Sequence, residues 1–195
     1  MRKVISLCVL MMILLPLSGC LGRDEGQKNL DLALTIRGEY LAMENFSAQA
    51  ELTADSGQRV YEFGLSAVGS DEETVLTVTA PEPVSGVTAR LKSGKSFLEY
   101  DELSIETGRL TQDGLTPVSA IPALLEAIRS GYITACGPDD TGAFRVDYGD
   151  PDIPPGTGTE YVLWFDSQSH VPLRGEVSKD GVRCIECTFS SFTKE

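Results

Sequence analysis

Cys136, Cys184 and Cys187 carry the side chains best suited to redox or zinc chemistry. Cys184 and Cys187 have Cys-x-x-Cys spacing, but both lie in a run, 182–192, whose pattern is typical of a β-strand. Residues three apart on a strand point to opposite faces, so we do not expect these two sulfurs to bond to each other. Two alternatives stay open: free buried thiols, or a disulfide from Cys136 to Cys184 or Cys187 in an oxidising compartment.

Other groups for catalysis or metal binding are sparse. His170 is the only histidine, and no nucleophile motif accompanies it, which disfavours a Ser-His-Asp hydrolase. Asp147, Asp150 and Asp152 form an acidic loop of the kind that calcium prefers, but they lack the spacing and bidentate Glu of an EF-hand. We therefore predict no catalytic residues, no metal site and no cofactor, and that the protein is not an enzyme.

Cys20 offers a different chemistry, which is acylation of its sulfur. It follows the basic residues Arg2 and Lys3 and an apolar run, 4–15, that is too short to span a bilayer. The ending Leu17-Ser18-Gly19-Cys20 resembles the lipobox of bacterial lipoproteins, at which the cysteine receives a diacylglyceryl group and the leader is removed. An ordinary secretory leader, cleaved nearby, is the alternative.

This pattern predicts how the chain is divided and where it works. Residues 1–19 are expected to be a removed signal peptide, 20–28 a lipidated cysteine (diacylglycerol, palmitate) with a polar tether, and 29–195 a single domain. We expect the domain to lie outside the cytoplasm, anchored to the cell membrane by the lipid on Cys20. The anchor would be in the outer membrane if the host has one, since Leu21 and not Asp follows Cys20.

Charge restricts the partners. The leader holds two of the 16 basic residues and none of the 29 acidic ones, so its removal changes the net charge from −13 to −15. Such a domain does not bind nucleic acid, and an anionic membrane surface repels it. Membrane attachment therefore has to come from the acyl chains.

Apolar periodicity predicts the elements. Apolar residues three and four positions apart predict a first helix from Asn29 to about Met43 and a second at 119–131. The first helix is indicated by Leu30, Ala33, Leu34 and Leu41, with Ile36 and Tyr40. Alternation of apolar and polar residues predicts strands at 46–53, 61–67, 76–80, 87–92, 98–101, 143–148, 161–165, 171–178 and 182–192. The segment 103–115 is less regular and contains a further turn at Asp113-Gly114.

This order of elements resembles the LolA/LolB-like superfamily of envelope proteins, which includes RseB-like, LppX-like and germination-associated lipoproteins. The segment from Asp166 to Leu173 resembles the family's entry into the last hairpin, as do the Lys179-Asp180-Gly181 turn and Phe189 beyond it. The resemblance implies an α+β fold: a strongly curved antiparallel sheet, an incomplete barrel, with helices covering its apolar concave face.

On such a fold, apolar side chains of one sheet face and of the second helix would line a ligand cavity. The predicted set is Phe46, Ala48, Ala50, Leu52, Tyr61, Phe63, Leu65, Leu76, Val78, Leu91, Leu98, Tyr100, Leu124, Ile128, Ile185 and Phe189. Several members are small, which leaves room for an acyl chain. The alternative is that the helices fill this space completely, as any sheet packed on helices requires.

The resemblance implies two functions. The first is binding of a lipid or a lipidated protein segment in the concavity, for lipid or lipoprotein handling at the envelope. The second is a protein-interaction module that binds an envelope or germination enzyme through its sheet edge or its acidic convex face.

Overall fold

In the computed structural model, the described residues are 21–70, 72–92, 94–108 and 113–195. The leader and Cys20 lie outside them. Eleven strands of the described chain form one antiparallel sheet in the order β6-β5-β4-β3-β2-β1-β11-β10-β9-β8-β7. The strands are β1 (Asn45–Asp55), β2 (Val60–Ser70), β3 (Glu73–Ala80), β4 (Thr88–Lys92), β5 (Lys95–Tyr100), β6 (Leu103–Glu106), β7 (Tyr132–Pro138), β8 (Phe144–Gly149), β9 (Thr159–Phe165), β10 (Pro172–Lys179) and β11 (Val182–Lys194).

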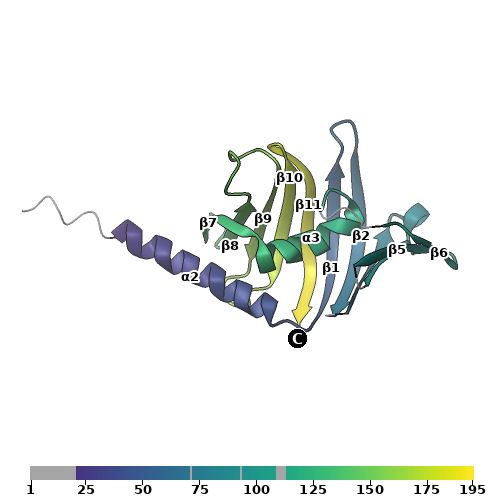
Figure 1. The fold of residues 1–195 in the computed structure, drawn as a ribbon, viewed down its shortest axis with the longest axis horizontal. Helices are drawn as coiled ribbons and strands as arrows, with labels where there is room; N and C mark the ends of the chain where they lie inside the picture. The colour runs from purple at the N-terminus through teal and green to yellow at the C-terminus, as the bar shows by residue number, and fades with distance from the viewer. Residues whose placement is uncertain (1–20, 71, 93, 109–112) are drawn as a thin grey trace, which may run out of the picture.

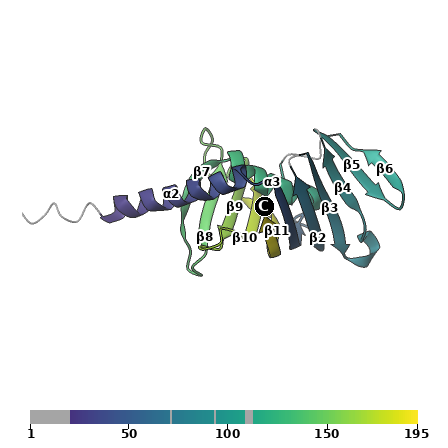
Figure 2. The ribbon, with the colours of Figure 1, turned by 90° about the horizontal axis from the view of Figure 1, so that it is seen from below.

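The sheet is curved and does not close, because β6 and β7 are its two edges. Helices α2 (Leu21–Leu41) and α3 (Pro117–Ser130) lie on its concave side, and a 3-10 turn, η1 (Glu82–Val84), follows β3. Figures 1 and 2 show α3 across the middle of the sheet, where it contacts β3, β9, β10 and β11, and α2 beside α3 and β7, whereas β4–β6 extend beyond the end of α3. The predicted α+β class and open antiparallel sheet are confirmed.

The two arms of the sheet meet at one seam, where β1 pairs with β11. Every other pairing in the sheet joins two strands that follow each other along the chain, as expected for hairpins. Next to the seam an aromatic cluster fixes the last turn of α2 to the sheet. Phe192 stacks on Phe46 with ring centroids 5.9 Å apart and contacts Tyr40 and Phe189 at 5.9 and 6.0 Å.

Helix α2 differs from the predicted first helix at both its ends. It begins at Leu21, so residues 21–28, which were expected to be a tether, form its first turns. Its buried stripe is Ala33, Ile36 and Tyr40, as expected. Leu30, Leu34 and Leu41, whose spacing also predicted the helix, are 37%, 47% and 62% exposed and lie outside the buried stripe. They lie on a neighbouring strip of the helix, and only one strip can face the sheet at a time.

Two arginines join the helices by reciprocal hydrogen bonds. The Nε atom of Arg37 in α2 donates to the carbonyl of Ile128 at 3.0 Å, and its Nη2 atom donates to the carbonyl of Gly131. In return, Arg129 of α3 donates from Nε to the carbonyl of Tyr40 at 3.0 Å. Each helix thus supplies a cation to the free carbonyls at the carboxyl end of the other.

Two strands were not predicted. β7 lacks a clear alternation, because Thr134 and Ala135 interrupt it and its register with β8 shifts between Ile133 and Ala135. β6 lies in the segment 103–115, whose pattern is less regular, and it covers only four residues. The missed strands are the two edges, which have only one neighbour to stabilise them.

Candidate functional site

The concave face consists of rows of side chains that run across the strands. One row joins Ala48, Ala67, Leu76, Ala89, Leu98 and Ile105, from β1 to β6. Its first four members are at most 2% exposed, Leu98 is half-buried and Ile105 is 63% exposed. The apolar surface therefore continues beyond the area that the helices cover.

Most of the predicted lining residues belong to the covered part. Eleven are at most 9% exposed: Phe46, Ala48, Ala50, Leu52, Leu65, Leu76, Val78, Leu124, Ile128, Ile185 and Phe189. The packing of α3 on β10 shows how closely the layers approach. A Cβ atom on Gly175 would come within 2.6 Å of a methyl carbon of the buried Leu124. Around Gly175 the helix side chains fill the space between the layers.

The remaining predicted residues are accessible. Phe63, Leu91 and Leu98 are half-buried, and Tyr61 and Tyr100 are 44% and 50% exposed. Sequence reasoning missed Leu103 and Ile105, which are 69% and 63% exposed and pair with Tyr100 and Leu98. The alternation Leu103-Ser104-Ile105 was a signal for them, but it is only one period long. We call Leu91, Leu98, Tyr100, Leu103 and Ile105 the open patch.

Apart from the open patch, an apolar hollow opens between α3 and the β8–β9 end of the sheet. It encloses about 270 Å³, and its walls include Ala123 and Ala127 of α3 and the cross-strand pair Tyr148 and Tyr161. The Tyr161 hydroxyl donates to the carbonyl of Asp113 at 3.4 Å. The small side chains of α3 leave this volume free.

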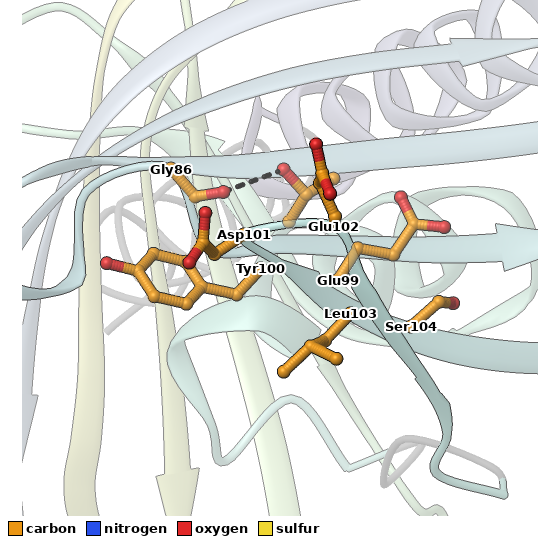
Figure 3. Close-up of a pocket in the computed structure, with 8 residues that line it drawn as sticks. Gly86, Glu99, Tyr100, Asp101, Glu102, Leu103 and Ser104 are labelled. Carbon is orange, nitrogen blue, oxygen red and sulfur yellow. Dashed lines mark hydrogen bonds between the residues drawn. The ribbon is translucent and has the colours of Figure 1, made fainter.

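The β5–β6 turn forms another hollow, of about 340 Å³, at the end of the open patch. Tyr100 and Leu103 pair across a two-residue turn, in which Asp101 and Glu102 have φ values of 48° and 65°. Figure 3 shows these four residues near Gly86, whose carbonyl accepts a hydrogen bond from the Thr88 hydroxyl at 3.3 Å. The hollow is acidic and exposed, unlike the apolar interior.

Comparisons with known proteins inform the fold. No protein-family model and no curated protein matches the sequence. Among solved structures, a DUF1329 family protein from Desulfovibrio piger is 10% identical, with a TM-score of 0.51 over 88% of this chain and 93% of that one. A LolA superfamily protein from Nitrosomonas europaea is 10% identical, with a TM-score of 0.46 over 86% and 93%. This chain shares its fold with the Desulfovibrio piger protein. The likeness at such identities concerns the fold alone.

On this fold, His170 connects α2 to the sheet. Asp166 shapes the β9–β10 turn by accepting the backbone N–H groups of Gln168 and Ser169 at 3.1 and 2.7 Å. Hydrogen bonds from Ser169 lower the pKa of this carboxyl group and keep it ionised. The turn places His170 Nδ1 2.7 Å from a carboxylate oxygen of Glu39.

Lys194 binds the other carboxylate oxygen of Glu39, so this residue joins α2, the β9–β10 turn and β11. Partial burial opposes ionisation of Glu39, but the hydrogen bonds from Lys194 and His170 outweigh it and lower its pKa. The hydroxyl of the neighbouring Tyr40 donates to the carbonyl of His170 at 3.1 Å. These contacts are structural, because they use the imidazole to hold a helix in place.

Cys136, Cys184 and Cys187, the cysteines of the described residues, are free thiols. Cys136 and Cys187 lie in the same row of the sheet, but β8, β9 and β10 separate them. Neighbouring strands are about 4.8 Å apart, which puts the two residues about 19 Å apart. Cys184 lies beside the β10–β11 irregularity, on the same strand as Cys187. The thiols are therefore free, but only Cys187 is buried, whereas Cys136 and Cys184 are half-buried. The distance along the row excludes a bridge from Cys136 to Cys187.

The acidic loop does not gather its carboxylates. Asp147 pairs with Arg145 Nε at 2.6 Å, and Asp150 accepts the backbone N–H of Asp152 at 2.9 Å. No group of three His, Cys, Asp or Glu side chains with metal-binding geometry occurs in the described part of the chain. From Leu21 onward, none of the described helices has the length and hydropathy of a membrane span.

Proposed function

We propose that this domain is an envelope lipoprotein whose concave face binds the acyl chain of a lipid or of a lipid-modified protein segment. One observation carries the proposal. The row from Ala48 to Ile105 is apolar along its whole length, deeply buried at β1–β4, half-buried at Leu98 of β5 and exposed at Ile105 of β6. An acyl chain lying on the open patch would cover apolar side chains that water contacts in the free protein, at about 25 cal/mol for each Å² buried.

The ligand class follows from the chemistry of this surface. Leu91, Leu98, Leu103 and Ile105 offer only hydrocarbon, and Tyr100 adds an aromatic face with one hydroxyl. Such a surface favours a flexible apolar chain over a polar metabolite. The acidic turn next to it, Asp101 and Glu102, disfavours an anionic headgroup at that end.

The proposal is tested on residues 20–195 with Cys20→Ser, a chain that retains every described element. We expect native mass spectrometry to find co-purifying lipid and a fluorescent fatty acid to bind. Leu98→Asp should weaken binding about tenfold or more, because the carboxylate would be desolvated beneath the ligand. Val68→Asp is the matched control, since Val68 is 57% exposed on the other face of β2. A protein that never carries lipid and takes up no fatty acid contradicts the proposal.

We also infer that Cys20 carries the membrane anchor. The lipobox-like ending at 17–20 supports this, and α2 begins directly after it. Labelled palmitate fed to the host should enter the wild-type protein and not the Cys20→Ser variant, which should also leave the membrane fraction. Equal membrane association of the two proteins would refute the anchor.

The domain is proposed to act by binding, without a catalytic step. His170 supports this view, because its Nδ1 atom is engaged by Glu39 and its backbone carbonyl by Tyr40. Any hydrolytic activity found in the pure protein that disappears in His170→Ala would argue for an enzyme instead.

A further inference from the structure

The two edges of the sheet differ in how accessible they are. β7 lies against α2: a Cβ atom on Gly137 would come 3.2 Å from the amide nitrogen of Asn29. β7 also ends in Pro138, which has no N–H to donate. β6 has no strand on its outer side among the described residues, and all four of its residues are exposed.

β6 also lacks the features that usually prevent edge strands from pairing. Its register with β5 runs without a bulge, and it contains no proline. Leu103 and Ile105 point to the concave side with 69% and 63% exposure, where natural edges often carry an inward charge. A strand added to β6 would extend two apolar rows of the sheet by one position each.

Charge selects the partner. Glu99, Asp101, Glu102 and Glu106 lie on the β5–β6 hairpin, where Lys95 is the only basic residue. Lys95 pairs with Glu106 at 3.4 Å, and Arg90 of β4 pairs with Glu99 at 3.2 Å. Asp101 and Glu102 have no hydrogen bond or ion pair within the described chain and border the hollow in Figure 3. A second copy of this acidic hairpin would meet like charges.

We propose that the outer edge of β6 binds an extended segment of a basic partner protein by β-strand addition. Alternate apolar side chains of the segment would pack against Leu103 and Ile105, and Lys or Arg side chains between them would face Glu106 and the acidic turn. Main-chain hydrogen bonds to β6 would supply the affinity. This interaction does not depend on lipid binding by the open patch.

The test uses residues 20–195 with Cys20→Ser and a labelled eight-residue peptide of alternating Val and Lys. Fluorescence anisotropy should show binding that weakens with salt, and hydrogen exchange should slow at the amides of 103–106. A peptide with N-methyl groups on alternate amides keeps its side chains but loses hydrogen bonds on one edge, and it should bind at least about tenfold more weakly.

Two sets of variants test the docking surface. Ile105→Asp should weaken binding about tenfold, whereas Val182→Asp, at the 62% exposed first residue of β11, should not. The double change Asp101→Asn and Glu102→Gln should reduce both the affinity for the peptide and the salt dependence of binding. The control, Glu51→Gln with Glu62→Gln on β1 and β2, should reduce both less.

Three results would overturn the proposal. Equal binding of the N-methylated peptide would show that main-chain pairing is not involved, and equal binding by Ile105→Asp would place the peptide elsewhere. A homodimer in sedimentation that Ile105→Asp dissociates would show that β6 pairs with a second copy. Fatty-acid uptake is measured on the same variants, so a failure here is distinguishable from a failure of the lipid proposal.

Discussion

At the scale of single residues, Gly175 determines how closely α3 approaches the sheet. Its missing side chain leaves the place that the buried Leu124 fills. Gly38 is a useful contrast, because it lies in α2 and a Cβ atom there would have no neighbour within 4 Å. The two glycines have the same chemistry and opposite packing environments.

Replacing Gly175 by Val should therefore lower the free energy of unfolding by about 1–3 kcal/mol, because the added atoms overpack the contact with Leu124. Gly38→Ala should raise it by about 0.5–1 kcal/mol, since alanine restricts the unfolded chain and fits the helix. Urea unfolding of both variants measures these changes. A Gly175→Val protein as stable as the wild type would mean that α3 can move away from β10.

Glu39 provides a pH-dependent contribution. Because the folded-state pKa of Glu39 is lowered from 4.5, its stabilisation is present above pH 4.5 and is lost as the pH falls through the folded-state pKa. Glu39→Gln should cost up to about 1 kcal/mol at pH 7, the usual value of a partly exposed ion pair. The difference from wild type should shrink below pH 4.5 in urea unfolding, and a constant difference at all pH values would contradict this role.

At the scale of elements, the helix pair depends on its reciprocal arginines. Arg37→Met and Arg129→Met should each lower the free energy of unfolding by about 1.5–3 kcal/mol, because each removes charged donors from half-buried carbonyls. Arg59→Met, on the exposed β1–β2 turn, should change it by less than about 0.5 kcal/mol. Equal effects of all three changes would show that the carbonyls are satisfied by water.

The elements also show what could be predicted from sequence. β1 alternates from Phe46 to Leu52 and β11 from Ile185 to Phe189, so the positions and buried faces of these strands follow from period, although the bulge at Ser190 breaks the period before Phe192. β6 and β7 do not, because one is short and the other carries a register shift. In α2, two apolar strips compete, and only the approach of Phe192 and Phe165 to Tyr40 selects the strip that is buried. Such tertiary contacts are not encoded in local spacing.

The same limit applies to the candidate site. The alternation correctly identified one apolar face of the sheet, from Phe46 to Phe189. It could not show where that face is covered, because coverage depends on where α3 ends relative to β4. Tyr100 and Ala50 lie on the same face, yet one is half exposed and the other is 4% exposed.

At the scale of the whole molecule, the open sheet keeps its thiols apart. We expect Cys136, Cys184 and Cys187 to remain free under oxidising conditions, because three strands separate Cys136 from Cys187. Burial raises the pKa of Cys187 to about 12, so iodoacetamide should modify it only after unfolding. Mass spectrometry of alkylated peptides checks both points, and a disulfide-linked peptide within one chain would contradict the strand order.

The seam between β1 and β11 also sets the order of folding. Each arm of the sheet pairs strands that are near in sequence, so each arm can form early. The seam joins residues as distant as Gln49 and Ser190, which are 141 positions apart, and closing so long a loop is slow. A chain that emerges amino end first therefore exposes the edge of β1 until the thirteen residues of β11 arrive, and during that time it is most open to pairing with other chains.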